Sequence, residues 1–261
     1  MSNPSNPVRF VFFGTAPLAE SVLAELAKAG MTPERIIEST RIDQTLIKEL
    51  STSEWDVFVV ASYGKLIPPE LLSMPKHGVV NVHPSLLPRL RGPSPIRSTI
   101  LRDDRETGVS IMLLDDEIDH GPLIAQKKIS VSPWPPKGHE LDRSLAEEGG
   151  NLLALMLPRW LAGDIEAQPQ NHDVATYCEE FKKEDGLLDL NGDAYQNLLK
   201  IRAFEGWPGT YAMFERAGKT LRVQILDAHL ADNTLVIDRV KPAGKREMGY
   251  EEFLHSGAKA A

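Results

Sequence analysis

Residues 78–88 read Gly-Val-Val-Asn-Val-His-Pro-Ser-Leu-Leu-Pro. The apolar start predicts a buried strand, which ends in Asn81 and His83 just before Pro84. Side chains at i and i+2 of a strand share a face, so these two would project together from the strand's carboxyl end, where open α/β sheets bind ligands. An amide that donates to a developing oxyanion, beside an imidazole that carries a proton, suits acyl transfer through a tetrahedral intermediate. Pro84 and Pro88 would keep the departing chain stiff.

The chain on both sides of this strand alternates apolar runs with amphipathic stretches. This alternation predicts an α/β fold with an open, mostly parallel, twisted sheet. The predicted strands are residues 8–14, 35–37, 55–61, 79–83 and 108–114, with 121–129 as part of a hairpin. The predicted helices are residues 17–29, 44–50, 95–102 and 140–161, the last weakened by Gly149 and Gly150.

The character of the sequence changes after this helix. Residues 163–176 are polar, contain Pro169 and lack apolar periodicity, which is typical of a linker. A further helix at 194–203 and short alternating segments at 211–214, 220–226 and 234–240 then predict a small β-rich domain. We therefore expect a catalytic domain over residues 1–162, a linker over 163–176 and a small C-terminal domain over 177–261.

The composition, 42% hydrophobic and 25% charged over 261 residues, is that of an ordinary globular protein. No apolar run approaches membrane-spanning length and residues 1–7 lack signal-peptide features, so we expect a cytoplasmic protein without a membrane partner. We also expect a monomer. The net charge of −8 offers no broad basic surface for nucleic acid. A single cysteine, Cys178, excludes an internal disulfide framework, and the seven histidines lack metal-ligand spacing, so we expect no metal.

A carboxylate cluster, Asp115-Asp116-Glu117-Ile118-Asp119-His120-Gly121-Pro122, follows another predicted strand. As a calcium loop it fails, because His120 stands where the turn glycine belongs and Gln126 where the bidentate glutamate belongs. A solvated acidic loop explains Asp115 to Glu117 equally well. Asp119 differs, because the glycine and proline that follow fix the turn. If Asp119 lies beside His83, it would hold the ring in one tautomer and stabilise its charged form.

Two glycine-containing segments imitate nucleotide-binding loops. Residues 216–220, Arg-Ala-Gly-Lys-Thr, resemble the end of a phosphate-binding loop, but Met213 stands where its first glycine belongs and no helix follows. We predict a hairpin turn there. Residues 14–17, Gly-Thr-Ala-Pro, lack the dinucleotide-binding glycine pattern and give no indication of NAD.

With these residues in view, the chain resembles the folate-dependent formyltransferase family, and within it the members that formylate methionyl-tRNA. The Asn-x-His-Pro string with the downstream aspartate is highly specific for formyl transfer and much less specific for the acceptor. The matching strings are Phe12–Thr15, Ala61–Pro68, Asn81–Pro88 with Arg91, Gly92 and Pro95, Thr107–Met112 through Asp119–Gly121, Ile201–Gly209 and Lys241–Lys245.

The resemblance implies a formyltransferase-type, Rossmann-like domain, an abbreviated OB-like C-terminal domain and 10-formyltetrahydrofolate as the co-substrate. It implies that Asn81 donates to the oxyanion, His83 moves protons and Asp119 orients His83. Folate-binding positions, largely through main-chain contacts, would be Tyr63, Gly64, Leu66, Ile67, Pro68, Leu114, Asp115, Asp116 and Ile118. Positions that contact the other substrate would be Phe13, Gly14, Arg91 and Gly92.

The acceptor implied by the resemblance is initiator methionyl-tRNA, which would place the protein in translation initiation and one-carbon metabolism. Two departures stand out: residues 38–40 lead almost directly to Asp43 without the family's basic insertion, and residues 227–233 replace additional strands. Formylation of an amino-sugar nucleotide is therefore the alternative. Three others stay open: formylation of glycinamide ribonucleotide, which the loop at residues 14–17 disfavours, hydrolysis of formylfolate, and a non-catalytic folate- or RNA-binding module, which has no need of an intact trio.

Overall fold

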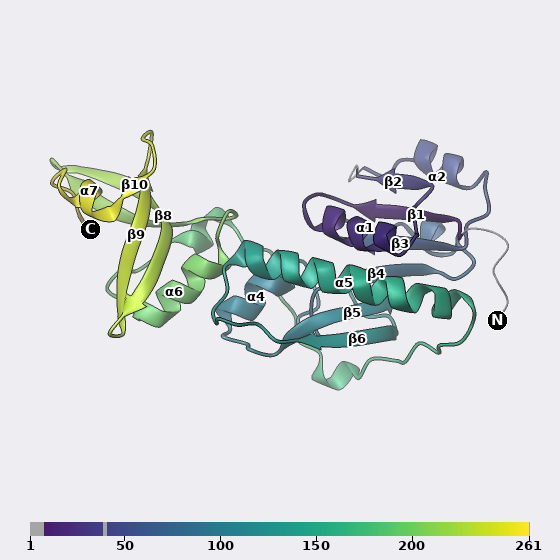
Figure 1. Ribbon diagram of the computed structural model, residues 1–261. Coiled ribbons are helices and arrows are strands. Elements are labelled where there is room, and N and C mark those ends of the chain that lie inside the picture. The colour runs from purple at the N-terminus through teal and green to yellow at the C-terminus, as the bar shows by residue number, and fades with distance from the viewer. Residues whose placement is uncertain (1–7, 39–40, 261) are drawn as a thin grey trace. The chain divides into compact units, whose positions relative to one another are not determined.

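The computed structural model describes residues 8–38 and 41–260 (Figure 1). Residues 1–7, for which we predict no signal peptide, lie outside these ranges. So do Ser39 and Thr40, which belong to the segment that lacks the basic insertion. Internal contacts divide the chain into two units. The first combines the chain up to Pro95 with Glu106–Ile129 and Asp142–Cys178, and the second combines Ile96–Arg105, Ser130–Leu141 and the chain from Glu179 onward. Each unit is therefore assembled from segments that are distant in sequence.

The first unit is built on a six-stranded sheet of order β2-β1-β3-β4-β5-β6. Its first four strands pair in parallel, whereas β5 pairs antiparallel with both β4 and β6. The predicted open, mostly parallel α/β sheet and the predicted hairpin are thus confirmed. The strands are β1 (Phe10–Gly14), β2 (Arg35–Ile37), β3 (Val57–Ala61), β4 (Val79–His83), β5 (Thr107–Leu113) and β6 (Leu123–Ile129).

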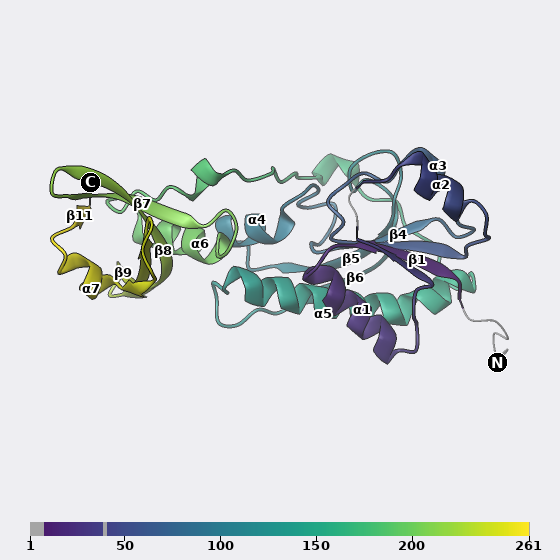
Figure 2. The same ribbon diagram turned by 90° about the horizontal axis from the view of Figure 1, so that it is seen from above.

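Helices cover both faces of this sheet, which explains why β1 and β3 are continuous apolar runs rather than alternating ones (Figure 2). On one face lie α1 (Leu18–Lys28) and α5 (Gly138–Leu161), whose residues from Asp142 belong to this unit. On the other face lie α2 (Gln44–Leu50) and α3 (Pro69–Leu72). There the buried core includes Phe13, Phe58, Leu50 and Leu71, and the two phenyl rings are 5.5 Å apart.

The two glycines that weaken α5 permit its close approach to its neighbours. A Cβ on Gly149 would lie 2.5 Å from Cγ1 of Val82 on β4. A Cβ on Gly150 would lie 2.8 Å from the Glu25 Cβ and 3.1 Å from the Val22 Cα on α1. The low helix propensity of glycine is therefore offset by packing against the strand that carries His83.

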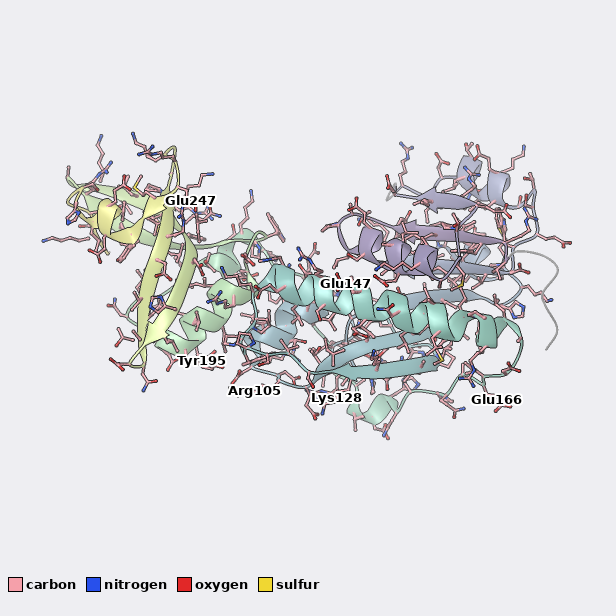
Figure 3. All side chains as sticks on the ribbon, in the orientation of Figure 1. Arg105, Lys128, Glu147, Glu166, Tyr195 and Glu247 are labelled. Atoms are coloured by element: carbon pink, nitrogen blue, oxygen red, sulfur yellow. The ribbon has the colours of Figure 1, made fainter. Side chains whose placement is uncertain are left out.

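The edge strand β6 exposes charged side chains on its outer part. Lys127 bonds to Glu148 and Lys128 bonds to Glu106, and Lys128 is labelled in Figure 3. Lysines on an edge strand discourage pairing with another chain. Across residues 8–38 and 41–260, no helix has both the length and the hydropathy that crossing a membrane requires.

The second unit contains an antiparallel sheet of order β10-β9-β8-β7-β11, which confirms the predicted β-rich C-terminal part. The predicted hairpin turn at residues 216–220 is also confirmed, since Arg216 pairs with Lys219 across it. The core of this unit gathers around the buried Phe214. Its strands are β7 (Thr210–Arg216), β8 (Lys219–Ala231), β9 (Thr234–Pro242), β10 (Met248–Gly249) and β11 (Lys259–Ala260). Its helices are α4 (Pro95–Leu101, from Ile96), the short η2 (Lys183–Gly186), α6 (Ala194–Ala203) and α7 (Tyr250–Leu254).

One carboxylate helps to hold residues 96–105 and 130–141 in the second unit. Asp103 Oδ1 accepts from Trp134 Nε1 at 2.5 Å and from the Tyr195 hydroxyl at 2.8 Å. Tyr195, labelled in Figure 3, lies on α6. These bonds join residues 96–105 and 130–141 to the C-terminal sheet unit.

Gly149→Ala tests the close packing of α5. In an exposed helix this change stabilises by about 1 kcal/mol. Here the methyl group must displace the stiff Val82 side chain, so we expect the free energy of unfolding to fall by about 1–3 kcal/mol. Urea unfolding measures the change. The control is Leu155→Ala, at a residue of the same helix that is 63% exposed. A stabilised Gly149→Ala protein would contradict the packing of α5 on β4.

Candidate active site

His83 ends β4 with its ring buried, and both ring nitrogens have neighbours. Nε2 lies 3.0 Å from the carbonyl oxygen of Leu90, and Nδ1 lies 3.5 Å from Oδ1 of Asp119. A carbonyl oxygen only accepts, so the Leu90 contact assigns a proton to Nε2. In the neutral ring Nδ1 then carries the lone pair, and it faces a carboxylate. The structure thus brings together two of the three side chains proposed from sequence.

Asp119 is held in place by its backbone as well as its side chain. Its φ is +48°, in the left-handed region that aspartate tolerates better than most residues. Its second carboxylate oxygen, Oδ2, accepts from the main-chain N–H of Gly92 at 2.8 Å. The carboxylate is therefore fixed between the main chain after Arg91 and the His83 ring, and its side chain is 13% exposed.

Asn81 lies two residues before His83 on β4, so their side chains share one face of the sheet. It is half-buried, and its cross-strand neighbour on β5 is Met112, whereas that of His83 is Ser110. The site therefore presents an amide donor, an imidazole with one titratable nitrogen and a carboxylate. This set can stabilise an oxyanion and move a proton.

The turn after His83 is held by side chains from the neighbouring strands. Ser110 on β5 donates to the Ser85 carbonyl at 2.6 Å and accepts from the Leu87 N–H at 3.1 Å. Gln126 on β6 donates to the Leu87 carbonyl at 2.7 Å and to the Ser110 hydroxyl at 2.9 Å. Sequence reasoning missed Ser110 and Gln126 as parts of the site. Ser110 lies in the matching string Thr107–Met112 without an assigned role, Gln126 stands in no matching string, and the alternation of β5 and β6 alone gives no signal of this role.

Residues 168–178, named the strap below, run along the loops that hold His83 and Asp119. The strap pairs with β6 through a bridge between Leu123 and Gln168, and with the site loop through a bridge between Arg91 and Tyr177. All of the segment predicted as a linker, residues 163–176, therefore belongs to the first unit. Its polar residues bond to main-chain groups of the loops, which is why they show no apolar periodicity.

The first loop proposed to bind folate, Tyr63–Pro68, offers main chain and one apolar side chain. The Tyr63 ring is buried 5.6 Å from Phe13, and burial raises the pKa of its hydroxyl. Ile67 also lies in the core, and Pro68 precedes α3. Gly64 is exposed with φ +71°, and Leu66 is 76% exposed.

The second proposed folate loop, Leu114–Ile118, is partly closed by its own hydrogen bonds. Leu114 is half-buried, and its N–H donates to the Val79 carbonyl at 2.8 Å. Asp115 lies 2.7 Å from His120 Nδ1 and accepts from the N–H of Glu117. The Asp116 side chain is exposed and Ile118 is 53% exposed. The exposed residues of the two loops are therefore Gly64, the aliphatic Leu66 and Ile118, and the charged Lys65, Asp116 and Glu117.

Two of the predicted substrate-contact residues, Phe13 and Arg91, have buried side chains. The Phe13 ring is fully buried in the core. The Arg91 guanidinium is 1% exposed and donates to Gln170, His172 and the Tyr177 hydroxyl. Neither side chain is accessible to a substrate, because a buried ring and a buried cation are satisfied by partners inside the fold.

The neighbouring glycines also have structural reasons. A Cβ on Gly14 would lie 2.5 Å from the Ala61 carbonyl oxygen, so glycine permits close packing of β1 on β3. Gly92 has φ +109°, and a Cβ there would lie 2.6 Å from the Cys178 carbonyl oxygen. His120 stacks on His172, 4.0 Å between ring centres, which places both in the polar surroundings of Arg91. Within residues 8–38 and 41–260, no group of three or more His, Cys, Asp or Glu side chains could hold a metal ion.

Comparisons with known proteins agree with this geometry. Residues 14–157 match the family model described as formyl transferase. A methionyl-tRNA formyltransferase of Chloroflexus aurantiacus is 40% identical over 194 residues, which cover 74% of this chain and 62% of the relative. One of Roseiflexus sp. is 34% identical over 258 residues, covering 90% of this chain and 78% of the relative. The chain thus spans less than two thirds of the Chloroflexus protein's length.

Solved structures share the fold. Methionyl-tRNA formyltransferase from Clostridium thermocellum superposes with a TM-score of 0.67 at 18% identity, covering 90% of this chain and 98% of that one. HypX from Aquifex aeolicus in complex with tetrahydrofolic acid gives a TM-score of 0.75 at 16% identity, covering 96% of this chain and 47% of that one. These identities support a common fold and no finer assignment.

Replacement of Arg91 tests the buried network under the site. Arg91→Met keeps most of the side-chain length but leaves buried acceptors without donors, so we expect the free energy of unfolding to fall by about 1–3 kcal/mol for each acceptor that water cannot reach. Chemical denaturation measures the loss. Arg246→Met, at a side chain 85% exposed, is the matched control and should change stability by less than about 0.5 kcal/mol. Equal stability of the Arg91→Met protein and the wild type would contradict the network.

Proposed function

The chain belongs to the formyl transferase family, and from that membership we propose that it transfers the formyl group of 10-formyltetrahydrofolate to the amino group of methionyl-tRNA. The observation that carries the proposal is the approach of the Asp119 carboxylate to Nδ1 of His83. His83 lies on β4, the strand that also presents Asn81. In this proposal the reaction belongs to one-carbon metabolism and translation initiation, and the chain acts in the cytoplasm as a monomer.

Each of the three side chains has a separate task. The Asn81 amide donates to the formyl oxygen as negative charge develops there. His83 takes the proton of the attacking amine at Nδ1, because Nε2 already donates to the Leu90 carbonyl. The Asp119 carboxylate, 3.5 Å away, stabilises the positive ring and orients it. His83 then returns the proton to the leaving nitrogen, so the ring ends the cycle as it began.

The two strand-end loops offer an open peptide and apolar side chains to a flat heterocyclic ring. Nothing lies within 4 Å of where a Gly64 Cβ would stand, so the peptide there is open to a ligand. The aliphatic side chains of Leu66 and Ile118 are 76% and 53% exposed and offer apolar surface. 10-Formyltetrahydrofolate would supply the electrophilic formyl carbon. The folate-binding role of Tyr63–Pro68 and Leu114–Ile118 is part of the proposal, and the HypX complex with tetrahydrofolic acid supports folate as the co-substrate.

The acceptor is the less constrained half of the proposal. The names of the relatives favour methionyl-tRNA. One observation favours an amino-sugar nucleotide instead: the chain runs from Ile37 at the end of β2 to Gln44 at the start of α2 without a basic insertion, and the net charge is −8. A nucleic acid needs positive surface to displace its counterions, whereas a sugar nucleotide needs only a local site.

Single replacements in the trio test the division of tasks. We expect His83→Ala to lower kcat by about 10²–10⁴-fold, the usual contribution of a general acid–base. Asn81→Ala should lower kcat by about 10²–10³-fold, as expected for the loss of one oxyanion donor. Folate affinity, measured by isothermal titration, should change little. His255→Ala, at an exposed histidine, serves as the control. Loss of folate binding in proportion to activity would assign His83 to recognition rather than proton transfer.

A panel of acceptors tests the substrate. Wild-type protein with 10-formyltetrahydrofolate should formylate methionyl-tRNA and leave amino-sugar nucleotides unmodified. Added salt should raise the KM for tRNA, because protein–phosphate contacts release counterions and therefore weaken as the salt concentration rises. Formylation of the amino-sugar nucleotide alone would contradict methionyl-tRNA as the acceptor. Release of formate with no acceptor present would indicate a hydrolase.

A further inference from the structure

Gln170, in the strap, bonds to both sides of the catalytic pair although no motif contains it. Its side chain is buried, 5% exposed. Nε2 donates to the Asp119 carbonyl at 2.9 Å and to the Gly121 carbonyl at 2.7 Å. One amide therefore uses both of its protons to close the turn that presents the Asp119 carboxylate.

The other end of the same amide reaches the loop after His83. Gln170 Oε1 accepts from Arg91 Nη2 at 2.7 Å and from Arg91 Nε at 3.2 Å. Arg91 directly follows Leu90, whose carbonyl accepts from His83. A single side chain therefore links the turn of Asp119 with the side chain of Arg91, the residue after Leu90.

Thr176 fixes the second partner from the same strap. Its hydroxyl oxygen accepts from the Leu90 N–H at 3.0 Å. Its main chain donates to Pro88 at 3.1 Å and accepts from Arg91 at 2.9 Å. Leu90 has φ +58°, a conformation that a leucine seldom adopts without outside support. The hydroxyl of Thr176 supplies that support beside the carbonyl that His83 uses.

We propose that Gln170 and Thr176 are positioning residues of formyl transfer: Gln170 sets the Asp119 carboxylate, and Thr176 sets the Leu90 carbonyl, against the two nitrogens of His83. This inference rests on the proposed function, because its consequence is a rate. It differs from a purely structural role for the strap. Loss of these bonds changes the environment of the His83 ring in protein that is still folded.

Gln170→Glu is the sharpest test, because it replaces one N–H₂ group by an oxygen of similar size. The new oxygen would face two carbonyl oxygens and repel them, while the acceptor toward Arg91 is retained. Gln168→Glu is the matched control: the same replacement on the same strap, at an exposed side chain whose amide reaches only the Glu166 carbonyl.

Two readouts separate positioning from stability. In folded protein, Gln170→Glu should lower kcat roughly 10–100-fold, as small misplacements of catalytic groups do, with KM for the folate nearly unchanged. The ring ¹⁵N shifts of His83, assigned with His83→Gln, should change in Gln170→Glu and not in Gln168→Glu. Wild-type kcat and wild-type shifts in folded Gln170→Glu would overturn the proposal. A fall in activity that only follows the folded fraction, with unchanged shifts, would overturn it too.

If Gln170→Glu does not fold, variants of Thr176 test the proposal. Thr176→Val keeps the shape and removes the oxygen that accepts from Leu90, and Thr176→Ser keeps that oxygen. The proposal expects a lowered kcat and altered His83 shifts in the valine protein and near-normal values in the serine protein. Equal kcat and shifts in all three would overturn it. Absence of turnover in the wild type would contradict the proposed function alone, since the His83 shifts report positioning without turnover.

Discussion

The interaction on which this site depends is the 3.5 Å approach of the Asp119 carboxylate to Nδ1 of His83. The two side chains are only 13% and 5% exposed, so water and salt would screen the attraction between the carboxylate and a protonated ring less than at the surface. Burial also makes partners necessary for the remaining polar atoms. The Gly92 N–H satisfies the second carboxylate oxygen, and the Leu90 carbonyl satisfies the second ring nitrogen. The loops around His83 are arranged to supply these two groups.

The topology of the sheet lengthens the path that the chain takes to bring Asp119 to His83, compared with an all-parallel sheet. β5 runs antiparallel to β4, with Leu113 opposite Val80 and Ser110 opposite His83. The chain after β5 therefore leaves the sheet near the start of β4 and has to return to reach His83. Left-handed backbone at Asp119 and the two carbonyl bonds of Gln170 hold that return. The strap is thus part of the site's construction.

Several elements could be predicted from sequence because their signal is local. Buried runs such as 57–61 and 79–83 identify strands, and polar residues two apart at the end of one of them identify the site. The burial of Phe13 and Arg91 could not be predicted, because a residue in a family string can serve packing as well as binding. The role of Gln170 could not be predicted for another reason. Its four hydrogen bonds go to Arg91 and to main-chain oxygens of a distant turn, and the periodicity of a sequence carries no information on such contacts.

The most direct test of the central claim is a double-mutant cycle on His83 and Asp119, measured as single-turnover formyl transfer to methionyl-tRNA. If the carboxylate acts by stabilising and orienting the ring, Asp119→Asn should cost little more once His83→Ala is present, so the double variant should be about as slow as His83→Ala alone. Losses that multiply would mean that the two groups act independently, and would contradict the proposal that they form one proton-transferring unit.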